Sequence, residues 1–96
     1  SKKLKHLVSL NISKNNITDA GAKALAGSIN FGKLKKLDLN FNRIGDEGAR
    51  AIAGSSNFIN LESLKLGQNK IGTEGAQALN ESKTLQNLVH PVFGFY

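Results

Sequence analysis

The amino-acid sequence predicts an α/β solenoid, in which short strands form a parallel sheet and helices pack against it. Three observations support this prediction. An apolar motif recurs every 27 residues, and each copy contains a short alternation of apolar and polar residues. An Ala-rich segment with acidic residues at its start follows each copy. The alternation favours a strand, and the Ala-rich segment favours a helix that returns the chain to the next strand.

The repeated motif has the form L-x-x-L-x-L-x-x-N-x-(L/I) and begins at Leu7, Leu34 and Leu61. Three copies in one register, without insertions, make a chance match improbable. A chain of 96 residues is long enough for one domain, predicted to span 1–96. The expected repeats are about 7–33, 34–60 and 61–87, with a partial fourth at 88–96.

Each strand is expected in the centre of the motif, where the apolar and polar residues alternate. The three alternating segments are Leu10 to Ile12, Leu37 to Leu39 and Leu64 to Leu66. Because side chains of a strand point alternately to its two faces, the apolar residues should point into a core and the polar residues outward.

A helix of two or three turns is expected after each strand. Acidic residues lie where these helices should begin, and the helix dipole favours negative charge there. They are Asp19, Asp46, Glu47 and Glu74.

Glycines recur inside the predicted helices, at Gly21, Gly48 and Gly75. A glycine in a helix costs roughly 1 kcal/mol relative to alanine, so close approach of helix to sheet is the expected reason. Gly27 and Gly54 lie where the first two helices should end. Because the third repeat has Glu81 at this position, the third helix is expected to run further.

An asparagine occupies the ninth position of each motif, where the strand should end, at Asn15, Asn42 and Asn69. A polar side chain at that inward position must satisfy the amides of its own turn and of the neighbouring repeat. We therefore interpret these three residues as a structural ladder.

The whole repeat, including N-x-I-G-D-E-G-A from Asn42 to Ala49, resembles the ribonuclease-inhibitor-like class of leucine-rich repeats over about residues 4–90. The resemblance implies a sheet on the concave face, helices on the convex face and binding to another protein. The period of 27 and the Lys/Asn-rich composition are more similar to short repeat effectors of intracellular bacteria. This implies an effector or effector regulator that blocks a functional site, such as the active site of an enzyme.

The last residues depart from the motif. Leu88 is expected to begin a fourth strand, and Pro91 suits an edge strand because proline cannot donate to a further ladder. The terminal segment is expected to cap the core with partial exposure of Phe95 and Tyr96, and the alternative is that it leaves an exposed apolar patch for a partner. The alternative is that the chain is one piece of a longer receptor or scaffold solenoid. The first repeat, preceded by only a short segment, is expected to fray.

The outward strand residues form columns that vary in charge and size, as a specific surface requires. Phe41 is the clearest candidate, because aromatic residues dominate interface hot spots, although a Phe folded over the strand edge is an equal alternative. With few repeats, the interface should bury roughly 1,200 Å² in total. The predicted partner-binding residues are Ser9, Asn11, Lys14, Lys36, Asp38, Asn40, Phe41, Ser63, Lys65, Gln68, His90 and Phe95.

The formal charge of +6 favours acidic partners, which include nucleic acids as well as proteins. Because the lysines are scattered and do not follow one groove, nucleic-acid binding ranks second to protein binding. The expected protein is a monomer by itself, or a heterodimer with its partner.

No catalytic set is apparent, because the chain has no Cys and its two His lie near opposite ends. We expect no enzyme activity, no metal site and no cofactor. No apolar run approaches the roughly 20 residues that span a bilayer, so no membrane partner is expected. The lack of Cys favours a reducing, cytoplasmic location, and the resemblance to bacterial effectors implies delivery into a host cell.

Overall fold

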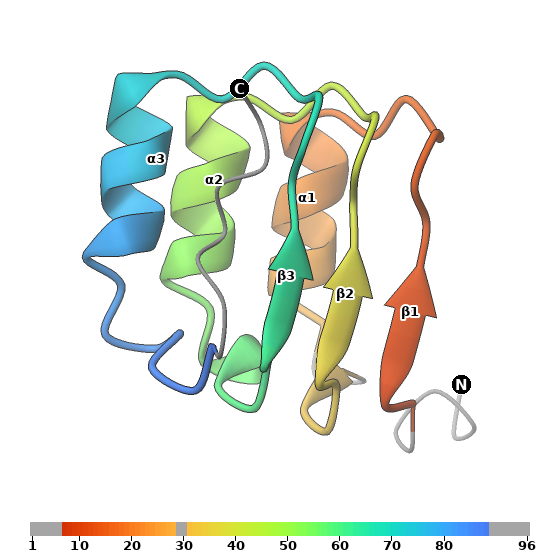
Figure 1. Cartoon of the computed structure of the whole chain (residues 1–96), viewed down its shortest axis with the longest axis vertical. Helices are drawn as coiled ribbons and strands as arrows, with labels where there is room; N and C mark the ends of the chain where they lie inside the picture. Colours follow the sequence, from red (N-terminus) through yellow and green to blue (C-terminus); the bar gives the residue numbers. More distant parts are fainter. Residues whose placement is uncertain (1–6, 29–30, 89–96) are drawn as a thin grey trace.

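The computed structural model describes residues 7–28 and 31–88 of the chain (Figure 1). Strands and helices alternate, and corresponding elements begin 27 residues apart. The elements are β1 (Ser9–Asn11), α1 (Asp19–Ala26), β2 (Lys36–Asp38), α2 (Asp46–Ala53), the 3-10 helix η3 (Ser56–Phe58), β3 (Ser63–Lys65) and α3 (Thr73–Asn80).

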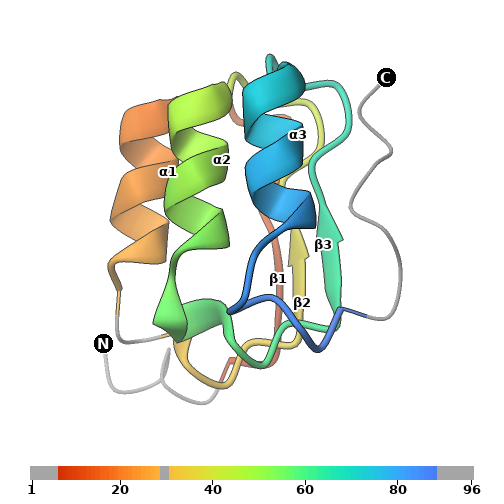
Figure 2. The ribbon, with the colours of Figure 1, turned by 90° about the vertical axis from the view of Figure 1, so that its left-hand side faces the viewer.

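The strands form one parallel sheet in the order β1-β2-β3. Its register places Lys36 beside Ser9 on one side and Ser63 on the other. The three helices form a second layer behind the sheet, side by side in the same order (Figures 1 and 2). The predicted α/β repeat architecture, with strands in a parallel sheet and a helix after each strand, is therefore confirmed.

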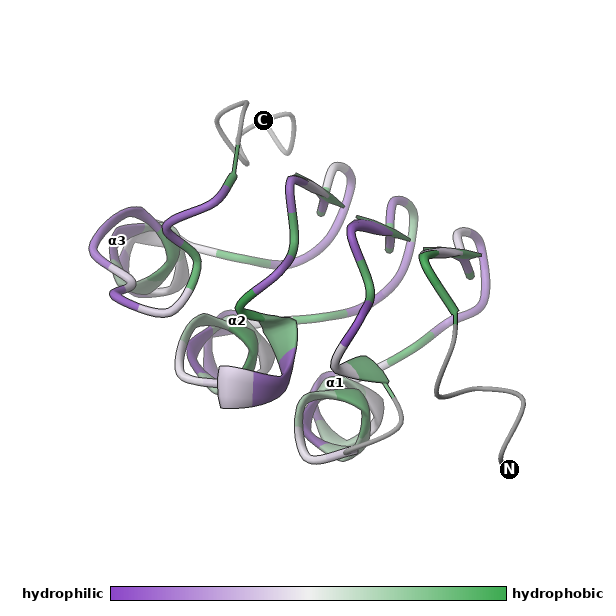
Figure 3. Ribbon diagram, turned by 90° about the horizontal axis from the view of Figure 1, so that it is seen from below, coloured by the Kyte–Doolittle hydropathy of each residue, from purple (hydrophilic) through white to green (hydrophobic). Residues whose placement is uncertain are grey.

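The core lies between the two layers. Figure 3 views the helices end-on and shows hydrophobic stretches where the chain runs from the strand side to the helices. The apolar positions of the second repeat are fully or almost fully buried, as predicted. Their largest members are Leu34, Leu37, Leu39, Ile44, Ile52 and Phe58. Burial of each such side chain contributes about 1.5–3 kcal/mol to the free energy of folding, so these core residues are a main source of stability.

The glycines inside the helices correct one expectation. A Cβ on Gly48 would lie 2.7 Å from Asp19 Oδ1 and 3.1 Å from Ala22 Cβ, both in α1. It would also lie 2.7 Å from Ile44 Cγ2 in its own repeat. Close packing of neighbouring helices, together with contact to the preceding turn, therefore explains the glycine, and the expected approach of helix to sheet does not.

The length of α3 corrects a second expectation. Although Glu81 replaces the glycine found at its counterparts, α3 has eight residues like α1 and α2. Gly54 and Glu81 have nearly the same backbone angles, with φ of −96° for both. Because this conformation is open to any residue, the helix ends at the same point without glycine.

The acidic residues at the helix starts do more than complement a dipole. Asp19 Oδ1 accepts hydrogen bonds from the backbone N–H groups of Gly45 and Gly48, at 2.6 and 2.9 Å. Asp46 Oδ1 accepts the corresponding bonds from Gly72 and Gly75. Each aspartate therefore caps the following helix as well as opening its own.

Candidate functional site on the sheet face

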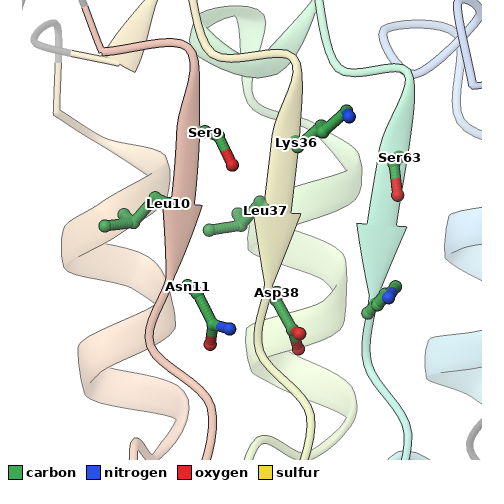
Figure 4. A pocket seen from close by; sticks show the side chains of 8 residues that line it. Ser9, Leu10, Asn11, Lys36, Leu37, Asp38 and Ser63 are labelled. Atoms are coloured by element: carbon green, nitrogen blue, oxygen red, sulfur yellow. The ribbon is translucent and has the colours of Figure 1, made fainter.

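The outward residues of the strands, and of the turns that follow them, form one continuous surface, which we call the sheet face. It consists of Ser9, Asn11, Ser13, Lys14, Lys36, Asp38, Asn40, Phe41, Ser63, Lys65 and Gln68, whereas Gly67, in the same position as Ser13 and Asn40, is buried. The parallel register aligns Ser9, Lys36 and Ser63 in one row and Asn11, Asp38 and Lys65 in the next (Figure 4). The strand layer thus converts the 27-residue period into rows of side chains.

A shallow depression of about 250 Å³ lies on the strand part of this surface. It brings together six of the residues predicted to bind a partner, from all three strands (Figure 4). The residues around it are Ser9, Leu10, Asn11, Lys36, Leu37, Asp38, Ser63 and Lys65.

The two lysines at the depression are exposed, and within the described ranges neither takes part in an ion pair. Among the described residues that surround the depression, Asp38 is the one carboxylate, and it is half-buried. Its Oδ1 accepts a hydrogen bond from the backbone N–H of Asn40 at 3.0 Å, which ties it to its own turn. The ammonium groups of Lys36 and Lys65 therefore remain available to an incoming group.

Two polar residues of the sheet face already have structural contacts. Asn11 Oδ1 accepts hydrogen bonds from the backbone N–H and the hydroxyl of Ser13. Asn40 Oδ1 accepts one from the backbone N–H of Gly67, at 2.6 Å, and so joins two repeats. Their oxygens support the turns, which leaves the side-chain amide groups as the parts that can contact a partner.

The residues of the sheet face that lie in the turns after the strands include three with positive φ angles. Lys14, Phe41 and Gln68 all have φ near +60°, in the left-handed region that disfavours bulky side chains. Phe41 is 53% exposed, so it does not fold down over the strand edge into the core. The Lys14 ammonium lies 5.7 Å from the centroid of the Phe41 ring, within the range of a cation–π contact.

Two of the three motif asparagines bond to the backbone of two repeats. Asn42 Oδ1 accepts from the N–H groups of Asn15 and Ile17, and its Nδ2 donates to the carbonyls of Ile12 and Leu39. Asn69 repeats this pattern one unit later, with Ile44 N–H and the Leu39 and Leu66 carbonyls. Asn15, in the first repeat, is exposed, and its side chain donates to the Ser13 carbonyl of its own repeat. Asn42 and Asn69 therefore have the contacts expected of a ladder.

Sequence reasoning missed a serine column at Ser28, Ser55 and Ser82, although it follows the same period. The Ser55 hydroxyl donates to the Ala26 carbonyl, and that of Ser82 donates to the Ala53 carbonyl. Ser55 and Ser82 therefore bond the last turn of the helix in the preceding repeat.

An apolar groove of about 380 Å³ was also missed. It lies on the first repeat, on the side away from β2 and α2. The residues around it are Ile12, Ile17, Gly21, Ala24, Leu25, Ser28 and Phe31. Their counterparts in the second repeat are covered by the first, and a comparison of repeats could have found the difference.

Some predicted features fall outside the described residues. His90 and Phe95, and the fourth strand and terminal cap expected after Leu88, belong to 89–96. Within 7–28 and 31–88, no group of three or more His, Cys, Asp or Glu side chains is placed to hold a metal ion. No helix in those ranges is long and apolar enough to cross a bilayer.

Comparison with known proteins adds one finding. The family model described as "Leucine Rich repeat" matches residues 3–26, 33–53 and 59–79, each match covering one strand and the helix after it. A comparison with curated proteins gave no match.

Proposed function

Because the chain belongs to the leucine-rich repeat family, we propose that it binds another protein through the sheet face. Leucine-rich repeats are a general protein-interaction module and a non-catalytic binding fold. The observation that carries the proposal is the depression at which six outward residues from three strands converge. Two of the six are lysines that form no ion pair with the described residues. In this proposal the sheet is the concave side and the helices are the convex side.

The size of the sheet face limits what it can bind. Strands lie about 4.8 Å apart, so three strands give a surface only about 10 Å across. Such a surface suits a loop or the rim of a cleft, with roughly 1,200 Å² buried in total. In small interfaces a few anchors supply most of the free energy of binding, and Phe41, Lys36 and Lys65 are the anchors we propose.

The test begins with capture of partners by the wild-type chain and by a variant that combines Phe41→Ala, Lys36→Ala and Lys65→Ala. We expect the variant to bind a captured protein at least 30-fold more weakly, which corresponds to about 2 kcal/mol. The matched control combines Ile59→Ala, Lys23→Ala and Lys83→Ala, which removes two charges and an exposed apolar side chain away from the sheet face. It should retain wild-type affinity. Equal losses in both variants would assign binding to another surface.

Nuclease treatment and added salt separate the second candidate function from the first. A net charge of +6 can attract phosphates, and Phe41 offers one stacking surface. Capture that survives nuclease and 0.5 M salt supports protein binding. If capture disappears with nuclease, nucleic-acid binding takes first place.

The proposal extends to a regulatory role, in which the chain acts as an effector, or an effector regulator, of a bacterium inside a host cell. It would cover a functional site of its partner, such as an active site, and act as a monomer or as one half of a heterodimer. Support for this part comes from the resemblance of the repeat and the Lys/Asn-rich composition. Once a partner is captured, its activity is measured with and without a saturating amount of the chain. Unchanged activity would refute the blocking role.

A further inference from the structure

The sheet face has an excess of positive charge. Three of its charged residues are Lys14, Lys36 and Lys65, and the fourth is Asp38. Three of the seven cations elsewhere in the described chain form ion pairs with acidic residues. These ion pairs are Lys23–Glu47, Lys35–Glu62 and Arg50–Glu74. The described residues of the sheet face form no ion pair, so its three lysines keep their charge unneutralised.

The position of Asp38 makes this charge pattern selective. It lies beside Lys65 in the strand register and two residues from Lys36 on the same strand. Its Oδ1 accepts a hydrogen bond from the backbone N–H of Asn40, so the carboxylate is held at its own turn, on the same surface as the two lysines. An acidic group that approaches must therefore reach the lysines while avoiding one fixed negative charge.

Phe41 adds an apolar contact at the end of the same surface. Its ring is exposed although its backbone is in a region that disfavours bulky residues, so neither burial nor local conformation accounts for a phenylalanine there. The Lys14 ammonium at 5.7 Å adds a third positive charge beside the ring.

We propose that the sheet face binds an acidic protein loop, with a carboxylate held by Lys36 and Lys65 and an apolar side chain against Phe41. This inference rests on the proposed function and specifies the chemistry of the partner. Charge complementarity selects an acidic segment, and the exposed ring of Phe41 selects one apolar side chain near it.

A protein loop fits this surface better than a nucleic acid does. A nucleic-acid strand carries a phosphate at every nucleotide, and across a face of three strands some of these would approach Asp38. A loop can place one carboxylate beside the lysines and an uncharged residue over Asp38. Among the described residues of the sheet face, Phe41 is the one aromatic residue that could stack on a base.

The test uses the full chain and a library of random 12-residue loops displayed on an inert scaffold. Loops are selected for binding to the wild type and counter-selected against a Lys36→Gln/Lys65→Gln variant. We expect the surviving loops to be enriched in Asp or Glu together with Leu, Ile or an aromatic residue. Survivors without an acidic excess, or no survivors, would overturn the proposal.

Individual loops then give a test of charge sign. Lys36→Gln/Lys65→Gln should weaken binding at least tenfold, and Asp38→Asn should strengthen it about threefold, because it removes a repelling charge. The control Lys23→Gln/Lys83→Gln removes the same net charge elsewhere and should change affinity less than twofold. If the control weakens binding as much as the Lys36/Lys65 variant, or if Asp38→Asn weakens it, no carboxylate is held at this point.

The outcomes separate this inference from the proposed function. A captured partner that is lost with the Phe41/Lys36/Lys65 variant but binds more weakly to Asp38→Asn would retain the sheet face as a protein site and reject the acidic loop. A random 20-nucleotide single-stranded DNA that binds through Lys36 and Lys65 more tightly than every selected loop would also reject it.

Discussion

At the scale of single residues, Phe41 combines two unfavourable features. A left-handed backbone costs a residue with a Cβ roughly 1–2 kcal/mol, and only Gly, Asn and Asp adopt it easily. Its ring is 53% exposed, so little burial offsets that cost. Asn16, only two residues after Lys14, has the same backbone conformation with a side chain suited to it. Phe41 thus departs from the residue that stability alone would favour.

Replacement of Phe41 by Asn should therefore stabilise the fold and weaken partner binding. The backbone term favours Asn by roughly 1–2 kcal/mol, while loss of the exposed contact with Lys14 costs about 0.5–1 kcal/mol. We expect a net gain of about 0.5 kcal/mol in the free energy of unfolding, measured by urea denaturation. Ile59→Asn, at an exposed position with φ of −61°, is the control and should give no gain. A less stable Phe41→Asn variant would contradict this account.

Sequence reasoning reached the residues of the sheet face but not their backbone. The period of 27 placed Ser9, Lys36 and Lys65 on one surface because strand pairing in a solenoid follows the repeat. The left-handed conformation of Phe41 was not predictable, since Lys, Phe and Gln in that column carry none of the usual Gly or Asn signal.

At the scale of elements, the helices are joined to one another by their first turns. The carboxylate of Asp46, at the start of α2, holds the N–H groups of Gly72 and Gly75 at the start of α3. Sequence reasoning assigned this aspartate only to the dipole of its own helix. Its role as an acceptor depends on the distance between neighbouring helices. The repeat period in the sequence gives no information about that distance.

Asp46→Ala should lower the free energy of unfolding by about 1–2 kcal/mol, because two N–H groups of α3 lose their acceptor. The control is Glu47→Ala, which also removes a negative charge from the first turn of α2 but only an exposed ion pair with Lys23. It should cost less than about 0.5 kcal/mol. Both values are measured by urea unfolding, and equal losses would show that the inter-helix bonds contribute nothing.

Two glycine substitutions test the packing of neighbouring helices. In Gly48→Ala the new Cβ would meet Asp19 Oδ1 and Ile44 Cγ2, each at 2.7 Å, so overpacking should cost about 1–3 kcal/mol despite better helix propensity. In Gly54→Ala the Cβ would meet only the Arg50 carbonyl at 3.5 Å, an ordinary contact. That variant should gain about 0.5 kcal/mol. The free energies of unfolding of both variants are measured by thermal and urea denaturation. An unchanged stability of Gly48→Ala would contradict the close packing of α2 against α1.

At the scale of the whole molecule, protection of the core differs between repeats. Ile12 and Ile17 are partly exposed at the apolar groove, whereas their counterparts Leu39 and Ile44 are fully buried. That the first repeat frays stays a prediction, and the comparison of burial offers a way to test it. In a solenoid each repeat is stabilised by its neighbours, so opening should begin where burial is least.

Hydrogen exchange can compare equivalent amides directly. The N–H of Ile12 donates to the Asp38 carbonyl at 3.0 Å, and that of Leu39 donates to the Lys65 carbonyl at 2.8 Å. The two hydrogen bonds are alike, so a difference in exchange reports the stability of the surrounding repeat. We expect Leu39 to exchange at least tenfold more slowly than Ile12, a difference of about 1.4 kcal/mol in opening free energy. Equal rates would indicate that the described repeats open together.

The asparagine ladder makes the contacts between neighbouring repeats recur at a fixed period along the solenoid. Asn42 and Asn69 make equivalent bonds one period apart, and the two aspartate caps do the same. Duplication of one 27-residue unit would therefore reproduce these asparagine and aspartate bonds across the new junction. It would widen the sheet by a single strand, about 4.8 Å. Duplication or deletion of whole units would accordingly change the width of the sheet in steps of one strand. An insertion or deletion of any other length would disrupt the asparagine and aspartate bonds between repeats.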